Sequence, residues 1–182
     1  MSFFKLPLVL VLGLVLLSGC KGMQEDLSPS GQDKRTATSN VTDTTTTTST
    51  VDFTVYDTQG QPVSLSQALG GKRGVVLYFT MWCPVCATHT EHLVHQVMPL
   101  YPNFGYYLVD YVSGDFTAAA RAQQDAGYGN ASFGVLADGN KQMVNLLNAT
   151  MGTTVVINPQ NEVVFNEDFK DGTRLAETLK GL

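Results

Sequence analysis

The chain has 182 residues, of which 43% are hydrophobic and 15% charged, and its formal net charge is -5 at pH 7. This length suits one domain with a full core plus tails, and it is too short for two ordinary domains. The composition suits a globular protein, and the acidic balance excludes the basic surface that nucleic acid requires of a partner. We therefore expect one catalytic or binding domain.

The first 19 residues predict an export signal. After Lys5 an apolar run extends over residues 6–17, about 12 residues, whereas a membrane span needs about 20. The run ends in Leu17-Ser18-Gly19-Cys20, which resembles the lipobox of bacterial lipoproteins. The resemblance implies a signal peptide over 1–19, an acylated Cys20 and a lipid-anchored domain in the bacterial cell envelope, in the periplasm or otherwise outside the cytoplasmic membrane. The alternative is that residues 1–19 remain as an uncleaved anchor and Cys20 carries no lipid. The domain would be exported in that case too.

Residues 20–50 predict a disordered tether behind the lipidated cysteine. They are mostly small and polar, with a run of threonines at 44–48, and they cannot bury enough apolar surface to fold. A flexible segment of about 30 residues has an r.m.s. span of roughly 30 Å. Such a tether would hold the domain clear of a membrane surface.

Residues 51–182 predict a globular domain in which strands and helices alternate. Strands are expected at 53–56, 61–64, 75–79, 106–112, 133–137, 153–157 and 162–165, and helices at 66–69, 84–98, 116–126, 141–147 and 173–179. The continuous apolar run Val75–Phe79 indicates a strand that is buried on both faces. This order predicts an α/β fold with a mixed central sheet and helices on both faces.

Cys83 and Cys86 are the only thiols left once Cys20 carries lipid. They follow a buried strand and open a predicted helix, where unpaired backbone N–H groups stabilise a thiolate. Pro84 fits the first turn, which needs no N–H from it. We therefore predict Cys83 as the attacking nucleophile and Cys86, one turn later, as the resolving thiol. A redox-inert, permanent disulfide remains an alternative, although a disulfide that closes a loop of only two intervening residues stabilises a fold little.

The run from Val75 to Cys86, the segment Thr153–Pro159 and the strand after it resemble the TlpA/ResA-type thiol–disulfide oxidoreductases over residues 51–182. The resemblance implies a thioredoxin-like fold, no cofactor, and disulfide exchange with exported protein thiols or disulfides. It also implies a membrane or periplasmic redox partner, often in cytochrome c maturation or envelope redox homeostasis. The direction of electron flow and the protein substrate do not follow from the motif.

Gly152 marks a departure from that family, whose members carry a cis-proline directly before the matching strand. A non-proline cis bond costs about 2.5 to 4 kcal/mol, so we expect Met151–Gly152 to be trans. The resemblance then implies a wider substrate groove, with Met151 supplying the backbone nearest the sulfur. Two hypotheses follow: glycine preserves a close backbone approach and ordinary exchange, or the missing proline opens the dithiol to a metal ion.

All three histidines, His89, His92 and His95, follow Cys86 at intervals of three residues. Each such step turns a helix by about 300°, so neighbours lie close but four ligands cannot meet one ion. Cys83, Cys86 and His89 could share copper or zinc, which makes a metal-binding or metal-delivering protein the main rival hypothesis. Without metal, His89 could carry protons or stabilise the Cys83 thiolate.

Trp82 is expected to pack over the dithiol and to offer an apolar contact to substrates. Leu77 occupies the place where thioredoxins carry a buried acid, so we expect no strand carboxylate in that role. Thr80, three residues before Cys83, is similar to the threonine of the peroxiredoxin motif.

A peroxidase remains the weaker alternative. Val76 stands where the proline of the peroxiredoxin motif belongs. Arg121 and Arg174 fall on helix patterns, so neither is expected to support a peroxidatic cysteine.

Overall fold

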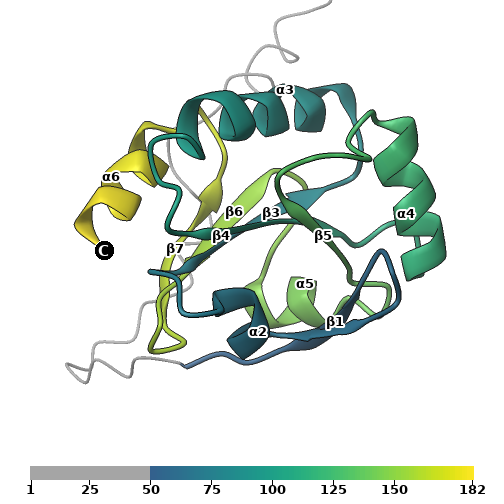
Figure 1. The fold of residues 1–182 in the computed structure, drawn as a ribbon, viewed down its shortest axis with the longest axis horizontal. Helices are drawn as coiled ribbons and strands as arrows, with labels where there is room; N and C mark the ends of the chain where they lie inside the picture. The colour runs from purple at the N-terminus through teal and green to yellow at the C-terminus, as the bar shows by residue number, and fades with distance from the viewer. Residues whose placement is uncertain (1–49) are drawn as a thin grey trace, which may run out of the picture. The chain divides into compact units, whose positions relative to one another are not determined.

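A seven-stranded mixed sheet organises residues 50–182, the part of the chain that the computed structural model describes (Figure 1). The strand order is β2-β1-β5-β4-β3-β6-β7. The strands are β1 (Thr54–Asp57), β2 (Pro62–Ser64), β3 (Val75–Thr80), β4 (Gly105–Asp110), β5 (Gly134–Ala137), β6 (Thr153–Ile157) and β7 (Val163–Asp168). The predicted signal peptide, Cys20 and nearly all of the predicted tether lie outside the described residues.

Strand β3 lies in the middle of the sheet, parallel to β4 and antiparallel to β6. All six of its residues are buried, as its continuous apolar run predicts. Its last residue, Thr80, stands beside Asp110 at the end of β4. Because the carboxyl ends of β3 and β4 meet at the same edge, side chains that follow these two strands come together there.

Helices cover both faces of the sheet, which confirms the predicted fold class. The helices are α2 (Leu65–Leu69), α3 (Pro84–His92), the π-helical turn η2 (Leu93–Val97), α4 (Phe116–Asp125), α5 (Gln142–Leu147) and α6 (Thr173–Gly181). In Figure 1, α3 and α6 lie on one side of the sheet and α2 and α5 on the other. Each side has its own core cluster of buried apolar side chains.

Two elements differ from their predicted form. The helix expected over 84–98 is α-helical only to His92, and η2 then completes it with a wider turn that has i→i+5 hydrogen bonds. Strand β7 extends to Asp168 rather than ending at Phe165, because edge strands accept the polar residues that obscured the pattern. The longer β7 brings the backbone of Phe169 against Gly152.

Candidate active site

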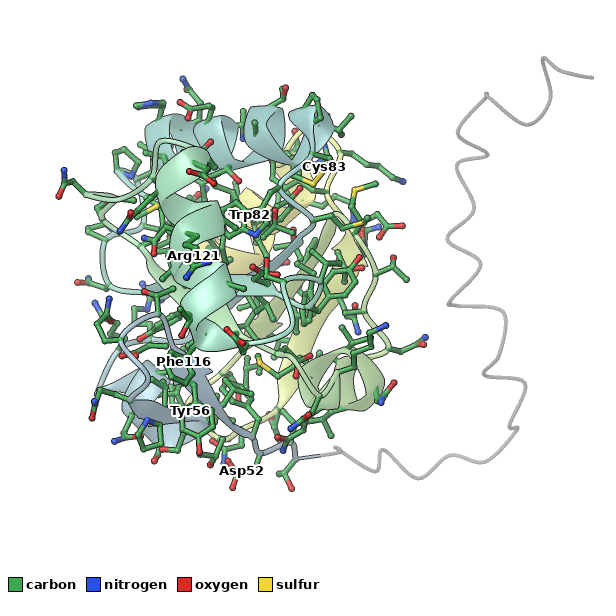
Figure 2. All side chains as sticks on the ribbon, turned by 90° about the vertical axis from the view of Figure 1, so that its right-hand side faces the viewer. Asp52, Tyr56, Trp82, Cys83, Phe116 and Arg121 are labelled. Carbon is green, nitrogen blue, oxygen red and sulfur yellow. A yellow bond between two sulfur atoms is a disulfide. The ribbon has the colours of Figure 1, made fainter. Side chains whose placement is uncertain are left out.

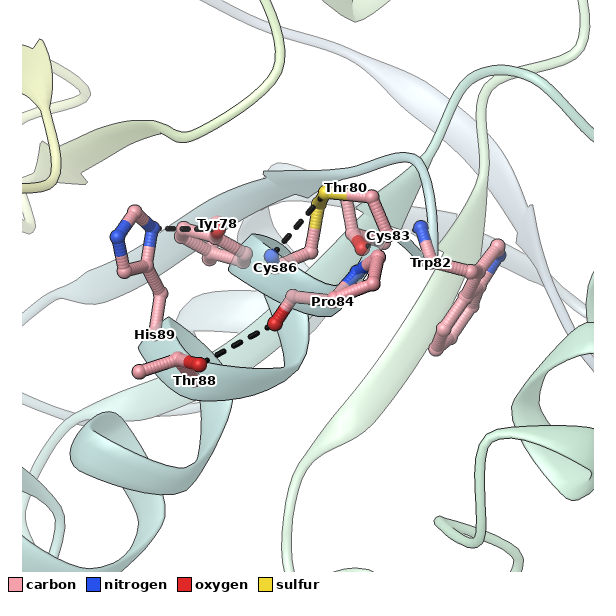
Figure 3. Close-up of a disulfide and its surroundings, with 8 residues drawn as sticks. All are labelled: Tyr78, Thr80, Trp82, Cys83, Pro84, Cys86, Thr88 and His89. Atoms are coloured by element: carbon pink, nitrogen blue, oxygen red, sulfur yellow. Dashed lines mark hydrogen bonds between the residues drawn. A yellow bond between two sulfur atoms is a disulfide. The ribbon is translucent and has the colours of Figure 1, made fainter.

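The structure joins Cys83 and Cys86 in a disulfide at the start of α3 (Figure 3). Cys83 is the N-cap residue in extended conformation, and its Sγ accepts a hydrogen bond from the amide of Cys86 at 3.2 Å. Pro84 occupies the first turn, as predicted. Cys83 is half-buried, whereas Cys86 is only 1% exposed. The Cys83 sulfur is therefore the one that an outside thiol or disulfide can reach more easily.

Trp82 lies next to Cys83 (Figure 2) and hydrogen-bonds to a buried carboxylate at the end of β4. Its indole Nε1 donates to Asp110 at 2.7 Å, and its amide donates to the Thr80 hydroxyl at 3.0 Å. The φ of Trp82 is 58°, a conformation that costs a bulky residue roughly 1 to 3 kcal/mol. These two hydrogen bonds offset that cost and fix the peptide that leads into Cys83.

Asp110 is a buried strand carboxylate near the site that the sequence analysis did not single out. Although Leu77 is apolar and buried, β4 supplies a carboxylate that is only 1% exposed. One of its oxygens accepts from Trp82, and the other accepts from the amides of Val112 and Ser113, each at 3.0 Å. The sequence signal was present, since a carboxylate ending a buried parallel strand lies at the edge where such sheets place their sites.

Gly152 lies beside the end of β3. Its amide donates to the Phe79 carbonyl at 2.9 Å, and its carbonyl accepts from the Phe169 amide at 2.8 Å. The Met151–Gly152 bond is trans, as expected. A Cβ at Gly152 would meet no atom within 4 Å, so no described residue crowds this position. Its φ of +84° favours glycine, and the same value is incompatible with proline.

His89 packs behind the disulfide instead of facing a common metal position (Figure 3). Its Nδ1 lies 2.9 Å from the hydroxyl of Tyr78, and its ring centroid lies 4.6 Å from that of Phe169. Within residues 50–182, no three histidine, cysteine or acidic side chains form a group that could hold a metal ion. The hypothesis of a Cys83, Cys86 and His89 metal site is therefore not supported, because the sulfurs are bridged and the imidazole is held by Tyr78.

The other two histidines turn away round the helix, as the three-residue spacing predicts. His92 packs on Phe169 at a centroid distance of 5.5 Å. His95 is exposed and lies 3.0 Å from Glu91, which also accepts a hydrogen bond from the Tyr128 hydroxyl. These contacts give His92 and His95 structural roles.

The residues of the peroxidase alternative do not assemble around Cys83. The Thr80 hydroxyl is used by the Trp82 amide, and Arg174 pairs with Glu167 at 2.7 Å. Figure 2 places Arg121 on α4, away from Cys83. Neither of the two arginines that were considered therefore supports a peroxidatic cysteine.

His89 predicts a pH-dependent component of stability. Burial, with a smaller contribution from the nearby His92, lowers the pKa of His89. As the pH falls below about 6.5, an unfolded chain protonates this residue before the native protein does, so stability is lost until the lower native pKa is reached. We expect urea unfolding between pH 7 and 5 to show a smaller loss for His89→Asn than for the wild type.

The exposed His95 supplies the control for that measurement. The variant His95→Asn removes a histidine without touching Tyr78 or Phe169, and its loss of stability toward low pH should be no smaller than that of the wild type, because His95 pairs with Glu91. An unchanged pH dependence in His89→Asn would contradict the prediction.

Comparisons with known proteins agree with this architecture. The family model described as "AhpC/TSA family" matches residues 47–166. No curated protein matches the sequence. Similar solved structures include a thioredoxin-like protein from Aeropyrum pernix, at 17% identity and a TM-score of 0.58, over 72% of this chain and 89% of that one.

Two Mycobacterium tuberculosis structures are also similar. A secreted disulfide oxidoreductase homologous to E. coli DsbE has 20% identity and a TM-score of 0.54, over 71% of this chain and 96% of that one. The peroxidoxin BcpB has 19% identity and a TM-score of 0.59, over 73% of this chain and 94% of that one. At these identities the likeness shows a thioredoxin-like fold.

None of the helices within residues 50–182 has both the length and the apolar composition that a bilayer span needs.

Proposed function

The chain belongs to the AhpC/TSA family and is a thioredoxin-like oxidoreductase, and from this premise we propose that it exchanges disulfides with exported proteins through Cys83 and Cys86 while a lipid on Cys20 anchors it at the bacterial cell envelope. One observation carries the proposal: a disulfide at a helix N-terminus with one half-buried and one buried sulfur. A role in cytochrome c maturation or envelope redox homeostasis belongs to the same proposal.

The unequal burial of the two sulfurs supports a two-step reaction. In the reduced protein, the Cys83 thiolate attacks a substrate disulfide, forms a mixed disulfide and releases one substrate thiolate, which takes up a proton. The Cys86 thiol loses its proton, attacks the Cys83 sulfur, re-forms the Cys83–Cys86 disulfide and releases the second substrate thiolate. Two electrons pass to the substrate, and an external dithiol reverses the sequence. Helix N-terminal amides near Cys83 favour its thiolate form.

Apolar side chains next to the disulfide suit a protein substrate better than a small one. Met81, two residues before Cys83, and Val85, between the two cysteines, are 46% and 53% exposed, and Met151 before Gly152 is 38% exposed. Trp82 is half-buried and adds an aromatic surface beside Cys83. Exposed apolar residues of this kind contact the main chain and apolar side chains of a partner.

The decisive experiment measures turnover. Reduced protein is mixed with a peptide whose internal disulfide holds a fluorophore and a quencher together, and glutathione resupplies electrons. We expect catalytic cleavage of the peptide, whereas a redox-inert disulfide would give no rate above that of glutathione alone. In the native host, the wild type should fractionate with membranes and Cys20→Ser should not. If both forms were found with the membranes, or both in the soluble fraction, the lipid anchor would be contradicted. The proposed exchange reaction would not be affected by that result.

A further inference from the structure

A cavity lies beside the segment that connects β7 to α6, and neither cysteine of the disulfide lines it. It has a volume of about 270 Å³ and is lined by Thr154 of β6, by residues of β7 and by the segment that leads into α6. Figure 1 shows α6 beside β7 at the yellow end of the chain. A dry cavity of about 150 Å³ is enough for benzene, so this one can hold a single substituted ring.

Thr154 contributes a polar atom without a hydrogen-bond partner to the lining of this cavity. The residue is 0% exposed, and its Oγ1 has no hydrogen-bond partner within residues 50–182. Because β6 is paired on both edges, the backbone of Thr154 is directed to β3 and β7 and its side chain faces away from the sheet. Phe165 and Leu175 provide apolar walls. A buried hydroxyl without a partner is costly, and a ligand atom that bonds to it recovers that cost.

The acidic groups around the cavity already have partners, and Lys170 adds a cation to the lining. Glu167 is paired with Arg174 at 2.7 Å, and Asp171 accepts from the amide of Thr173 at 3.0 Å. Asp168 accepts from the Thr153 hydroxyl at 3.1 Å. The first amides of α6 have no acceptor in the helix's own i→i−4 ladder, and Gly172 caps it without a side chain. These features favour a ligand atom that accepts hydrogen bonds.

We propose that this cavity binds a small molecule of single-ring size with an apolar body and one carbonyl or carboxylate group. The body packs against Phe165 and Leu175, and the acceptor oxygen takes the hydrogen of the Thr154 hydroxyl. The proposal does not depend on the disulfide chemistry. Phe169 also lines the cavity and its ring lies 4.6 Å from that of His89, so the imidazole protons of His89 report on occupancy.

The test titrates the full chain with benzoate, benzamide and toluene while the His89 imidazole resonances are followed by NMR. We expect saturable shifts with benzoate or benzamide and a Kd on the order of 0.1 to 1 mM. Thr154→Val removes the hydroxyl at nearly constant volume and should weaken benzoate or benzamide binding about tenfold, while toluene binding is unchanged. Binding of benzoate but not of benzamide would identify a carboxylate ligand, and binding of both probes would identify a carbonyl ligand.

Thr90→Val is the matched control, because Thr90 is a buried threonine of α3 that does not line the cavity. It should leave all three titrations unchanged. The unfolding midpoint of Thr154→Val should equal or exceed that of the wild type, since the variant removes an unpaired buried hydroxyl. Overturning results are the absence of saturable shifts with every probe, or equal weakening in Thr90→Val and Thr154→Val.

Discussion

Cys86→Ser is expected to accumulate a stable mixed disulfide with its substrate, and Cys83→Ser to form none. Cys83 is half-buried at the helix N-terminus, so its thiolate remains able to attack when Cys86 is absent, but nothing then resolves the product. Cys86 is 1% exposed, so in Cys83→Ser we expect attack on a disulfide peptide to be at least about 100-fold slower. Mass spectrometry of the protein after incubation with a disulfide peptide detects the adduct directly.

The comparison is made in a Cys20→Ser background, so that no third thiol reacts. The double variant Cys83→Ser with Cys86→Ser is the matched control, and it should gain no mass. Turnover should fall to the uncatalysed rate in all three variants, because each step of the exchange needs its own sulfur. An adduct on Cys83→Ser but not on Cys86→Ser would reverse the two roles.

Most of the fold follows from local patterns in the sequence. The apolar run Val75–Phe79 and the start of a helix at Pro84 depend on neighbouring residues alone, and β3 and α3 begin where these patterns predict. The end of β7 was missed because its last residues are polar and an edge strand accepts them. The π-helical turn at Leu93–Val97 was missed because no residue type marks it.

The candidate site was predictable only where its members are close in the chain. The Cys83, Pro84 and Cys86 arrangement is local, and the structure retains it. The Tyr78–His89 and Trp82–Asp110 hydrogen bonds join residues 11 and 28 positions apart, so they depend on how strands and helix pack. The position of His89 could not be predicted for the same reason: spacing along α3 could not show that its imidazole lies 2.9 Å from the Tyr78 hydroxyl.

The backbone conformation of Gly152 likewise could not be predicted from the residues next to it in the chain. The family pattern implied a wider substrate groove, and one hypothesis was that glycine preserves a close backbone approach. The structure shows that the positive φ requires glycine, while the room around its Cα is open. A conformational requirement of this kind depends on the strand partners of Thr153 and Phe79, which a sequence pattern does not contain.

Asp110→Ala is expected to lower the free energy of unfolding by about 3 to 5 kcal/mol. The variant leaves three donors without their acceptor, namely the indole of the half-buried Trp82 and the amides of the exposed Val112 and the half-buried Ser113. A donor that loses a charged acceptor costs roughly 1.5 to 3 kcal/mol, and water entering the vacated space recovers part of the sum. Urea unfolding followed by circular dichroism measures the loss independently of the indole.

Trp82 is the only tryptophan in the chain, so its fluorescence gives a second measurement at the site itself. Its positive φ costs free energy that the Asp110 hydrogen bond helps to offset, so the indole of Asp110→Ala should move into water and its emission should shift to the red. Because the Trp82 peptide leads directly into Cys83, we also expect the rate of disulfide exchange to fall. Asp110→Asn, which retains one acceptor oxygen, should lose less stability than alanine.

Asp115→Ala separates this effect from the loss of any hydrogen-bonded carboxylate. Asp115 caps α4 from an exposed position by accepting from the amide of Ala118 at 2.8 Å, and it has no contact with Trp82. Removal of such a cap costs about 1 kcal/mol, and the emission of Trp82 should stay unchanged. If Asp110→Ala lost no more stability than Asp115→Ala, the buried carboxylate would not be what holds Trp82 against the disulfide, and the strained peptide before Cys83 would need another source of support.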